Sequence, residues 1–158
     1  MRKPKTLEET YDTCVSGSHI NEITEVNHDK IKSLMDNADT CLRTASIVIK
    51  AISQKDKEWM NVFLNNYDAL RMCTEAFLLF DMFDIPNHEC LFACLCIKHP
   101  ELEFDWNFFN NVRKKRNGVN YYGEHITYDH WKAAELQFTL YINTLKKEIN
   151  KKLEISTE

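Results

Sequence analysis

The sequence predicts an all-α protein, an up-and-down bundle of four long helices plus one or two short helices. The chain of 158 residues contains only three glycines and three prolines, so it has few places to turn. Long helices with short links fit that composition better than a sandwich or a barrel does. Apolar residues also recur at three- and four-residue steps along several segments, which indicates amphipathic helices. No segment predicts a strand.

Length and composition bound the protein class. A chain of 158 residues with 44% apolar and 28% charged residues is typical of one globular domain. The net charge of −4 means that any nucleic-acid site must be a local patch on an acidic body. No apolar run approaches the roughly 18 residues of a membrane span. Because residues 1–5 also lack an apolar signal core, we expect a cytoplasmic protein without a membrane partner.

The first half of the chain predicts three helices. Residues 1–26 form an N-terminal extension in which residues 7–15 are expected to be helical. Asn27 or Asp29 can cap the next helix, which runs to about residue 53. Its apolar stripe consists of Ile31, Leu34, Met35, Ala38, Leu42, Ala45, Val48, Ile49 and Ile52.

The third helix, residues 56–83, is apolar on two faces, which predicts a central helix buried on two sides. Its remaining face carries Asp68, Arg71 and Glu75 at helical spacing. This face is either a solvated edge with an Arg–Glu pair four residues apart, or a polar strip facing a ligand groove or a second subunit.

The second half begins with a turn, because Pro86 pushes the residue before it out of helical conformation. A short apolar helix follows at residues 88–97, and His88 is expected to help cap it. Asp105 is the predicted N-cap of a helix ending near residue 117, before an irregular tyrosine segment at residues 118–123. Thr127 should cap the last helix, and residues 154–158 should form a frayed tail.

Six cysteines raise the question of a metal site or disulfides. Cys90, Cys94 and Cys96 crowd one segment, yet no C-x-x-C pair occurs, and a helix would turn Cys96 away from the other two. Structural zinc sites usually pair their ligands at tighter spacing on turns. We therefore expect no metal, no cofactor, and reduced, buried cysteines without a disulfide framework.

The segment of residues 113–123 carries the clearest chemical signal. It places Arg116 and Asn117 at a helix end, followed by Tyr121 and Tyr122. Arginine binds phosphate through a planar fork of donors, and tyrosine adds a stacking face with a hydroxyl. The pattern therefore predicts a site for a phosphate with a nucleobase or ribose edge, to which Lys115 adds positive charge. The alternative is a basic, solvated helix end with buried tyrosines.

Three segments together resemble the HEPN superfamily, the higher eukaryotes and prokaryotes nucleotide-binding domains, in their small stand-alone bacterial and archaeal form. They are Tyr67-Asp68-Ala69-Leu70-Arg71 with Glu75-Ala76, Asn87-His88-Glu89-Cys90-Leu91-Phe92-Ala93, and Arg116-Asn117 leading to Tyr121-Tyr122-Gly123. The resemblance covers about residues 7–153. It implies a single helical domain that dimerises, with two copies of an Arg-x(4–6)-His motif lining one cleft. It also implies an RNA or nucleotide ligand and, in many members, a metal-independent endoribonuclease toxin paired with a nucleotidyltransferase-type antitoxin.

The motif maps onto this chain in part. Arg116 and Asn117 match its start, but the histidine positions hold Tyr121, Tyr122 and Gly123, and the first histidine downstream is His125. A tyrosine, with an unperturbed pKa near 10, is a poor base at neutral pH. The resemblance thus implies catalytic roles for Arg116, Asn117 and Tyr121, and binding roles for the residues Tyr122, Lys115, Arg71 and Glu75.

Three functions remain open from the sequence. The first is a ribonuclease toxin, and the second is a degenerate HEPN module that binds RNA, a nucleotide or a nucleotidyltransferase partner without cleavage. In the third, the chain is a structural dimer in which Arg116 and Asn117 only brace a turn.

Overall fold

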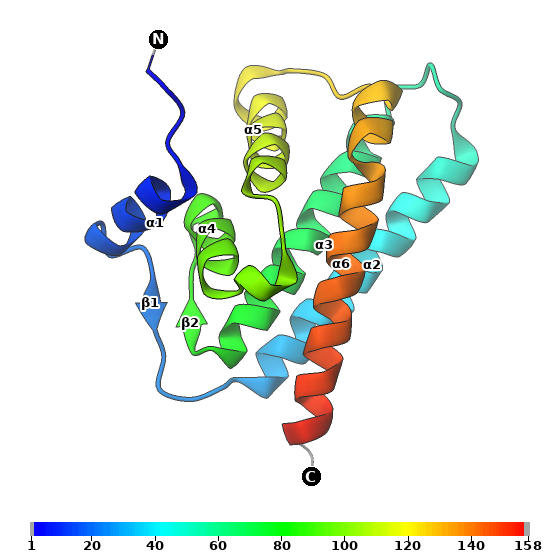
Figure 1. The fold of residues 1–158 in the computed structure, drawn as a ribbon. Coiled ribbons are helices and arrows are strands. Elements are labelled where there is room, and N and C mark those ends of the chain that lie inside the picture. Colours follow the sequence, from blue (N-terminus) through cyan, green and yellow to red (C-terminus); the bar gives the residue numbers. More distant parts are fainter. Residues whose placement is uncertain (1, 157–158) are drawn as a thin grey trace.

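The computed structural model describes residues 2–156, and its α-helices run in the order that the sequence predicts (Figure 1). The helices are α1 (Leu7–Ser16), α2 (His28–Ala51), α3 (Trp59–Phe80), α4 (His88–Lys98), α5 (Trp106–Tyr122) and α6 (Tyr128–Ser156), with a 3-10 turn at Pro100–Leu102. The protein is therefore all-α. None of the helices within residues 2–156 combines the length and the apolar character needed to cross a bilayer.

Helix α3 lies at the centre of the packing. It contacts α2 along its length and also contacts α4, α5 and α6, and the long helices α2, α3 and α6 run side by side in Figure 1. Most of its residues are buried, including the fully buried Phe63, Tyr67 and Leu70. The prediction of a central helix is confirmed, because apolar side chains on more than one face must meet more than one neighbour.

Capping residues begin the helices where expected. The Asn27 side chain accepts a hydrogen bond from Lys30 N at 3.0 Å, and the Asp105 side chain accepts one from Asn107 N at 2.9 Å. Asn87, rather than His88, is the N-cap of α4, and its Oδ1 accepts from Cys90 N at 3.0 Å. The expected cap role of His88 is therefore wrong.

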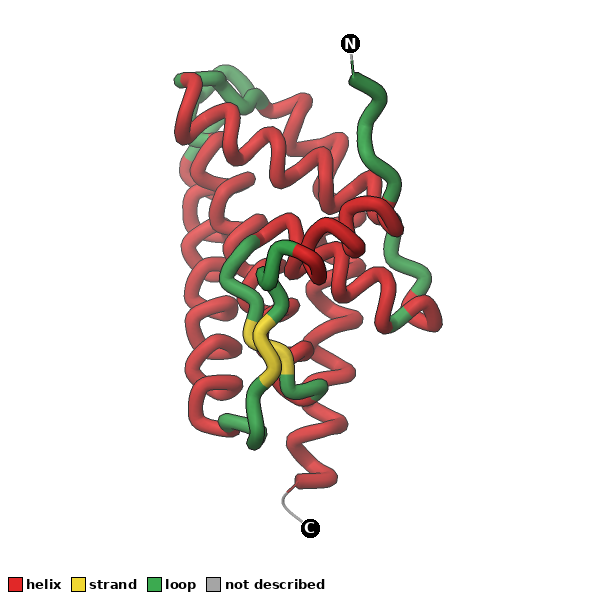
Figure 2. The backbone as a smooth tube through the Cα atoms, turned by 90° about the vertical axis from the view of Figure 1, so that its left-hand side faces the viewer, coloured by secondary structure: helices red, strands yellow, loops and turns green. Residues whose placement is uncertain are grey.

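Several helix boundaries differ from the sequence prediction. Helix α3 ends at Phe80, and the next residues form a short strand, β2 (Phe83–Asp84), which pairs antiparallel with β1 (Asn21–Glu22) (Figure 2). Helix α5 does not stop before Gly118 but continues to Tyr122, so the tyrosine segment is helical. The left-handed residue that ends α5 is Gly123, with φ 65°, and Glu124 N then donates to the carbonyl of Gly118 at 3.1 Å. At the other terminus, α6 extends to Ser156, so only residues 157–158 of the expected frayed tail lie outside the described residues.

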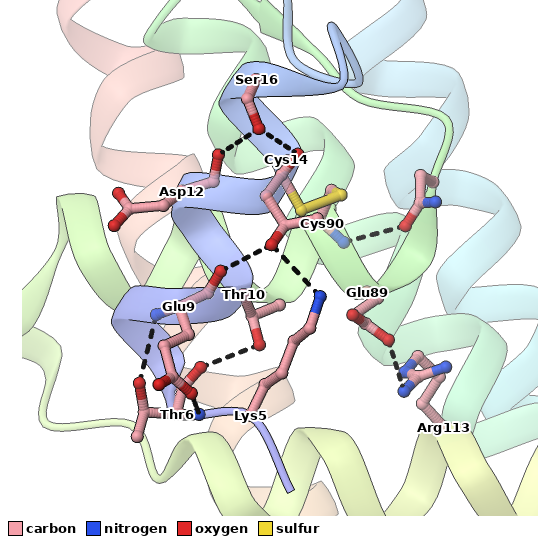
Figure 3. The surroundings of a disulfide bond; sticks show 12 residues. Lys5, Thr6, Glu9, Thr10, Asp12, Cys14, Ser16, Glu89, Cys90 and Arg113 are labelled. Carbon is pink, nitrogen blue, oxygen red and sulfur yellow. Dashed lines mark hydrogen bonds and ion pairs between the residues drawn. A yellow bond between two sulfur atoms is a disulfide. The ribbon is translucent and has the colours of Figure 1, made fainter. Parts of the chain in front are cut away.

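Helix α1 packs on α4 and is covalently joined to it (Figure 3). Cys14 and Cys90 form a disulfide, with their Cα atoms 5.6 Å apart. The expectation of reduced cysteines is therefore wrong for this pair, because the antiparallel strands and the packing of α1 bring together residues separated by 76 positions. It holds for Cys94 and Cys96, which are free and buried, and burial raises their pKa values to about 11 and about 12.

Candidate functional site

A polar cleft of about 440 Å³ lies between the start of α4 and the second half of α5. The sequence creates it locally, because the turn at Pro86 ends in the Asn87 cap and points the first residues of α4 toward α5. Its walls consist of Asn87, His88 and Glu89 from α4 and Arg113, Arg116, Asn117 and Tyr121 from α5.

Arg116 carries the uncompensated charge of this cleft. Its Nη1 donates a long hydrogen bond to Asn117 Oδ1 at 3.4 Å, and its Cζ lies 5.9 Å from the centre of the Tyr67 ring. Among residues 2–156, no carboxylate lies within ion-pair distance of this guanidinium. Since a guanidinium stays protonated and its donors here are largely unused, Arg116 can bind an anion from the cleft.

Arg113, one turn earlier on α5, is in a different situation. Its Nη2 lies 2.7 Å from Glu89 Oε2 and donates to Asn110 Oδ1 at 2.9 Å. Figure 3 shows this ion pair between α4 and α5. Its charge is thus largely neutralised, and the pair braces the two walls of the cleft against each other.

His88 lies in the same cleft and bonds to the core. Its Nδ1 and the Tyr67 hydroxyl are 3.0 Å apart. Burial and, to a smaller degree, the nearby charges of Arg71, Arg116 and Arg113 together lower the pKa of His88 to about 4. The imidazole is therefore neutral at pH 7.

The partner of His88 also keeps its proton. Burial raises the pKa of the Tyr67 hydroxyl to about 12, although the charges of Arg116, Arg113 and Arg71 act in the opposite direction. Two neutral groups thus share one hydrogen bond, and the imidazole tautomer decides which of them donates. Only one nitrogen of His88 is engaged by this bond, which leaves Nε2 for a ligand.

The structure brings together three of the residues that the sequence singled out. Arg116, Asn117 and Tyr121 line the cleft, and the Tyr121 side chain is 71% exposed at its mouth. Tyr122 is 80% exposed and does not line it. Lys115 lines a different cavity, of about 230 Å³, between α5 and α6.

The polar face of α3 forms an ion-pair cluster outside the cleft. Arg71 Nη1 lies 3.0 Å from Glu75 Oε1, and Arg71 Nε lies 3.9 Å from Asp68 Oδ1. Neither Arg71 nor Glu75 is among the cleft-lining residues. Arg71 nevertheless acts on the site through its charge, since it lowers the pKa of His88 more than either arginine of α5.

The two histidines downstream of the motif do not reach the cleft. His125 lines a separate pocket with the loop of residues 54–57, and His130 Nδ1 accepts a hydrogen bond from Thr127 N at 3.1 Å. The histidine that does line the cleft is His88, 28 positions before Arg116. The sequence pointed to the Asn87-His88-Glu89 segment but not to its role, because only the packing of α4 on α5 places it beside Arg116.

The described residues hold no group of three or more His, Cys, Asp or Glu side chains arranged to bind a metal ion. Comparison of the chain with protein-family models, with curated proteins and with solved structures finds no match.

Proposed function

We propose that this protein acts on RNA and binds a backbone phosphate in the cleft between α4 and α5, with Arg116 as the main anion ligand. The observation that carries the proposal is the state of Arg116: it faces an open cleft, and no carboxylate among residues 2–156 pairs with it. A partly buried cation without an anionic partner favours an anionic ligand.

The neighbours of Arg116 suit a nucleotide better than a simple anion. Asn117 offers an amide that can both donate and accept, and the exposed ring of Tyr121 offers a stacking surface for a base. Because Glu89 neutralises Arg113, the net positive charge of this cleft lies on Arg116, on a chain with a net charge of −4. Such a site binds locally instead of attracting nucleic acid over the whole surface.

Membership of the HEPN superfamily is part of this proposal. Two of the segments that carry the resemblance, Asn87-His88-Glu89 and Arg116-Asn117, lie on facing walls of the cleft. By the same resemblance, we propose a homodimer in which the two Arg116 side chains face a shared groove. A cytoplasmic location and a nucleotidyltransferase-type antitoxin belong to the same proposal.

A second candidate function is RNA cleavage without a metal ion, and the neutral imidazole of His88 in the same cleft favours it. In this reaction His88, with its own proton on Nδ1, takes the proton of a 2′-hydroxyl at Nε2, and the 2′-oxygen attacks the adjacent phosphorus. The 5′-oxygen then leaves and takes a proton from water, the resulting hydroxide takes the proton from Nε2, and a 2′,3′-cyclic phosphate remains. A base with a pKa of about 4 is available at pH 7 but weak, so we expect slow cleavage.

The proposed RNA binding is tested by substitution of Arg116. We expect Arg116→Gln to weaken the binding of a labelled single-stranded RNA about tenfold to a hundredfold at low salt, because a charge-assisted contact contributes about 1.5–3 kcal/mol. The matched control is Arg43→Gln, since Arg43 is an exposed arginine of α2 that bonds only to Thr40 among the described residues. Fluorescence anisotropy measures the RNA affinity of both variants. Equal affinity of the Arg116 variant and the wild type would rule out the proposal.

The same preparations test cleavage. Incubation of the wild type with the RNA in EDTA should give slow cleavage that ends in a 2′,3′-cyclic phosphate, and His88→Gln should abolish it while leaving binding within about threefold. If the wild-type protein leaves the RNA intact, the proposal of cleavage is ruled out and the proposal of binding still stands.

A further inference from the structure

A second polar pocket lies next to the proposed phosphate site. It has a volume of about 170 Å³ and is lined by Pro4, Lys5, Thr10, Glu89, Trp106, Asn110, Arg113 and Lys114. Glu89 and Arg113 also line the first cleft. The ion pair between these two residues therefore separates the cleft that contains Arg116 from the second pocket.

The second pocket carries two cations of its own. Lys5, on the segment before α1, bonds through Nζ to Thr13 Oγ1 at 3.2 Å, and Lys114 is an exposed residue of α5. Neither lysine has a carboxylate within ion-pair distance among residues 2–156. Since Arg113 offsets Glu89, this pocket has a net positive charge of about two.

The two pockets lie along one face of α5. Trp106, Asn110, Arg113, Asn117 and Tyr121 follow one another at steps of three and four residues, so they form a single stripe along the helix. The stripe is roughly 22 Å long, at 1.5 Å per residue. It begins at an indole and ends at an exposed phenol ring, and Lys114 and Arg116 flank it on opposite sides.

We propose that the second pocket is a phosphate subsite for the same RNA strand that Arg116 binds, so that the ligand is a single strand lying along α5. The subsite consists of Lys5 and Lys114, and the strand crosses the Arg113–Glu89 pair. A length of 22 Å corresponds to about six nucleotides at stacked spacing. A single strand fits because its bases can stack on Tyr121, whereas the bases of a duplex are already stacked inside it.

The fold holds the N-terminal segment in position for this role. Thr6 caps α1 in a reciprocal arrangement with Glu9, in which Glu9 N donates to Thr6 Oγ1 at 3.1 Å and Thr6 N donates to Glu9 Oε2 at 2.8 Å. The disulfide then fixes α1 to the first turn of α4, one residue after Glu89. Figure 3 shows Lys5, Glu89 and Arg113 within this small region.

This inference rests on the proposed function, and its test separates the two. The probes are labelled oligouridylates of two and eight nucleotides. We expect Lys5→Ala combined with Lys114→Ala to weaken the binding of the eight-nucleotide probe about tenfold. The affinity for the two-nucleotide probe should stay unchanged. The plot of log affinity against log salt for the octamer should become shallower by about 1.4, because each of the two lost phosphate contacts contributes about 0.7 to the slope for a single strand.

The matched control combines Lys50→Ala with Lys147→Ala, which removes the same charge from exposed positions on α2 and α6. The second subsite is overturned if the Lys5 and Lys114 variant binds the octamer as tightly as this control does while Arg116→Gln still weakens the binding of both probes. If Arg116→Gln binds both probes like the wild type, the proposed function itself fails. An eight-residue deoxyuridylate that binds as tightly as the RNA would overturn the assignment of the strand as RNA.

Discussion

At the scale of single residues, the environment of His88 determines what the cleft can do. The imidazole is partly buried, bonds to Tyr67 and has three arginines near it. Each of these features except the hydrogen bond disfavours the charged form, which explains why its pKa falls to about 4. A neutral imidazole beside a free guanidinium leaves the positive charge of the site on Arg116.

Arg71 offers a direct test of this arrangement. We expect Arg71→Gln to raise the pKa of His88, because it removes the strongest of the three repelling charges and frees the carboxylates of Asp68 and Glu75. Titration of the histidine resonances by NMR measures the change, with Arg43→Gln as the control on a distant exposed arginine. A pKa of His88 that stays the same in both variants would contradict the assigned cause.

The sequence predicts the residues of the site unevenly. Arg116, Asn117 and Tyr121 were predicted from their residue types within one short segment and from the resemblance to the HEPN motif, although Tyr121 was expected in an irregular segment and lies on α5. His88 and Glu89 come from another helix. Their approach to Arg116 depends on how α4 packs on α5, and local periodicity contains no information on that packing.

At the scale of elements, α5 shows how two glycines of one segment differ. Gly118 is buried inside the helix, and a Cβ there would meet the carboxylate end of the flexible Glu124 side chain. Gly123 ends the helix with φ 65°, and a Cβ there would meet nothing within 4 Å. A larger side chain at position 118 fits if the Glu124 side chain moves away, whereas position 123 requires a left-handed backbone conformation.

We therefore expect opposite effects from two alanine substitutions. Gly118→Ala should raise the free energy of unfolding by up to about 1 kcal/mol, because alanine favours helix and Glu124 can rotate into solvent. Gly123→Ala should lower it by about 1 kcal/mol through backbone strain alone. Urea denaturation of the two variants measures both changes, and destabilisation by Gly118→Ala would show that the Glu124 side chain is fixed.

The long helices could be predicted, because α2, α3 and α6 carry long apolar stripes, and Asn27 and Asp105 are recognisable caps of α2 and α5. The strands β1 and β2 could not, since each has two residues and is defined by backbone hydrogen bonds between distant segments. The end of α5 was misplaced because glycine both interrupts and ends helices, and the sequence gives no way to tell Gly118 from Gly123.

At the scale of the whole molecule, His99 links three parts of the chain. Its Nε2 lies 2.5 Å from Asp81 Oδ2 after α3, and its Nδ1 lies 2.8 Å from Glu101 Oε1 in the 3-10 turn. The hydrogen bond to Asp81 raises the pKa of His99, and the bond to Glu101 raises it further against the opposing effect of burial. A histidine whose pKa is raised on folding stabilises the folded state when it is protonated.

The stability that His99 contributes should therefore depend on pH with a definite sign. It should be fully present below the unfolded pKa of about 6.5 and be lost as the pH rises through the folded pKa. We expect His99→Gln to lower the free energy of unfolding by about 1 kcal/mol at acidic pH, since one of the two carboxylates is exposed, and by less in alkaline buffer. Urea titrations between about pH 5.5 and 8.5 measure the difference, with His125→Gln as the control. A difference that grows with pH would contradict the sign.

The bond between Cys14 and Cys90 closes residues 14–90 into a ring, with α5 and α6 outside it. A protease that nicks the chain after Lys55 or Lys57 leaves both pieces tethered, so a denaturing gel without reductant should show one full-length band. Added dithiothreitol should release two fragments. A cut after Glu124, beyond the ring, should give two fragments with or without reductant, and separation of the first pair without reductant would mean that the two sulfurs are thiols.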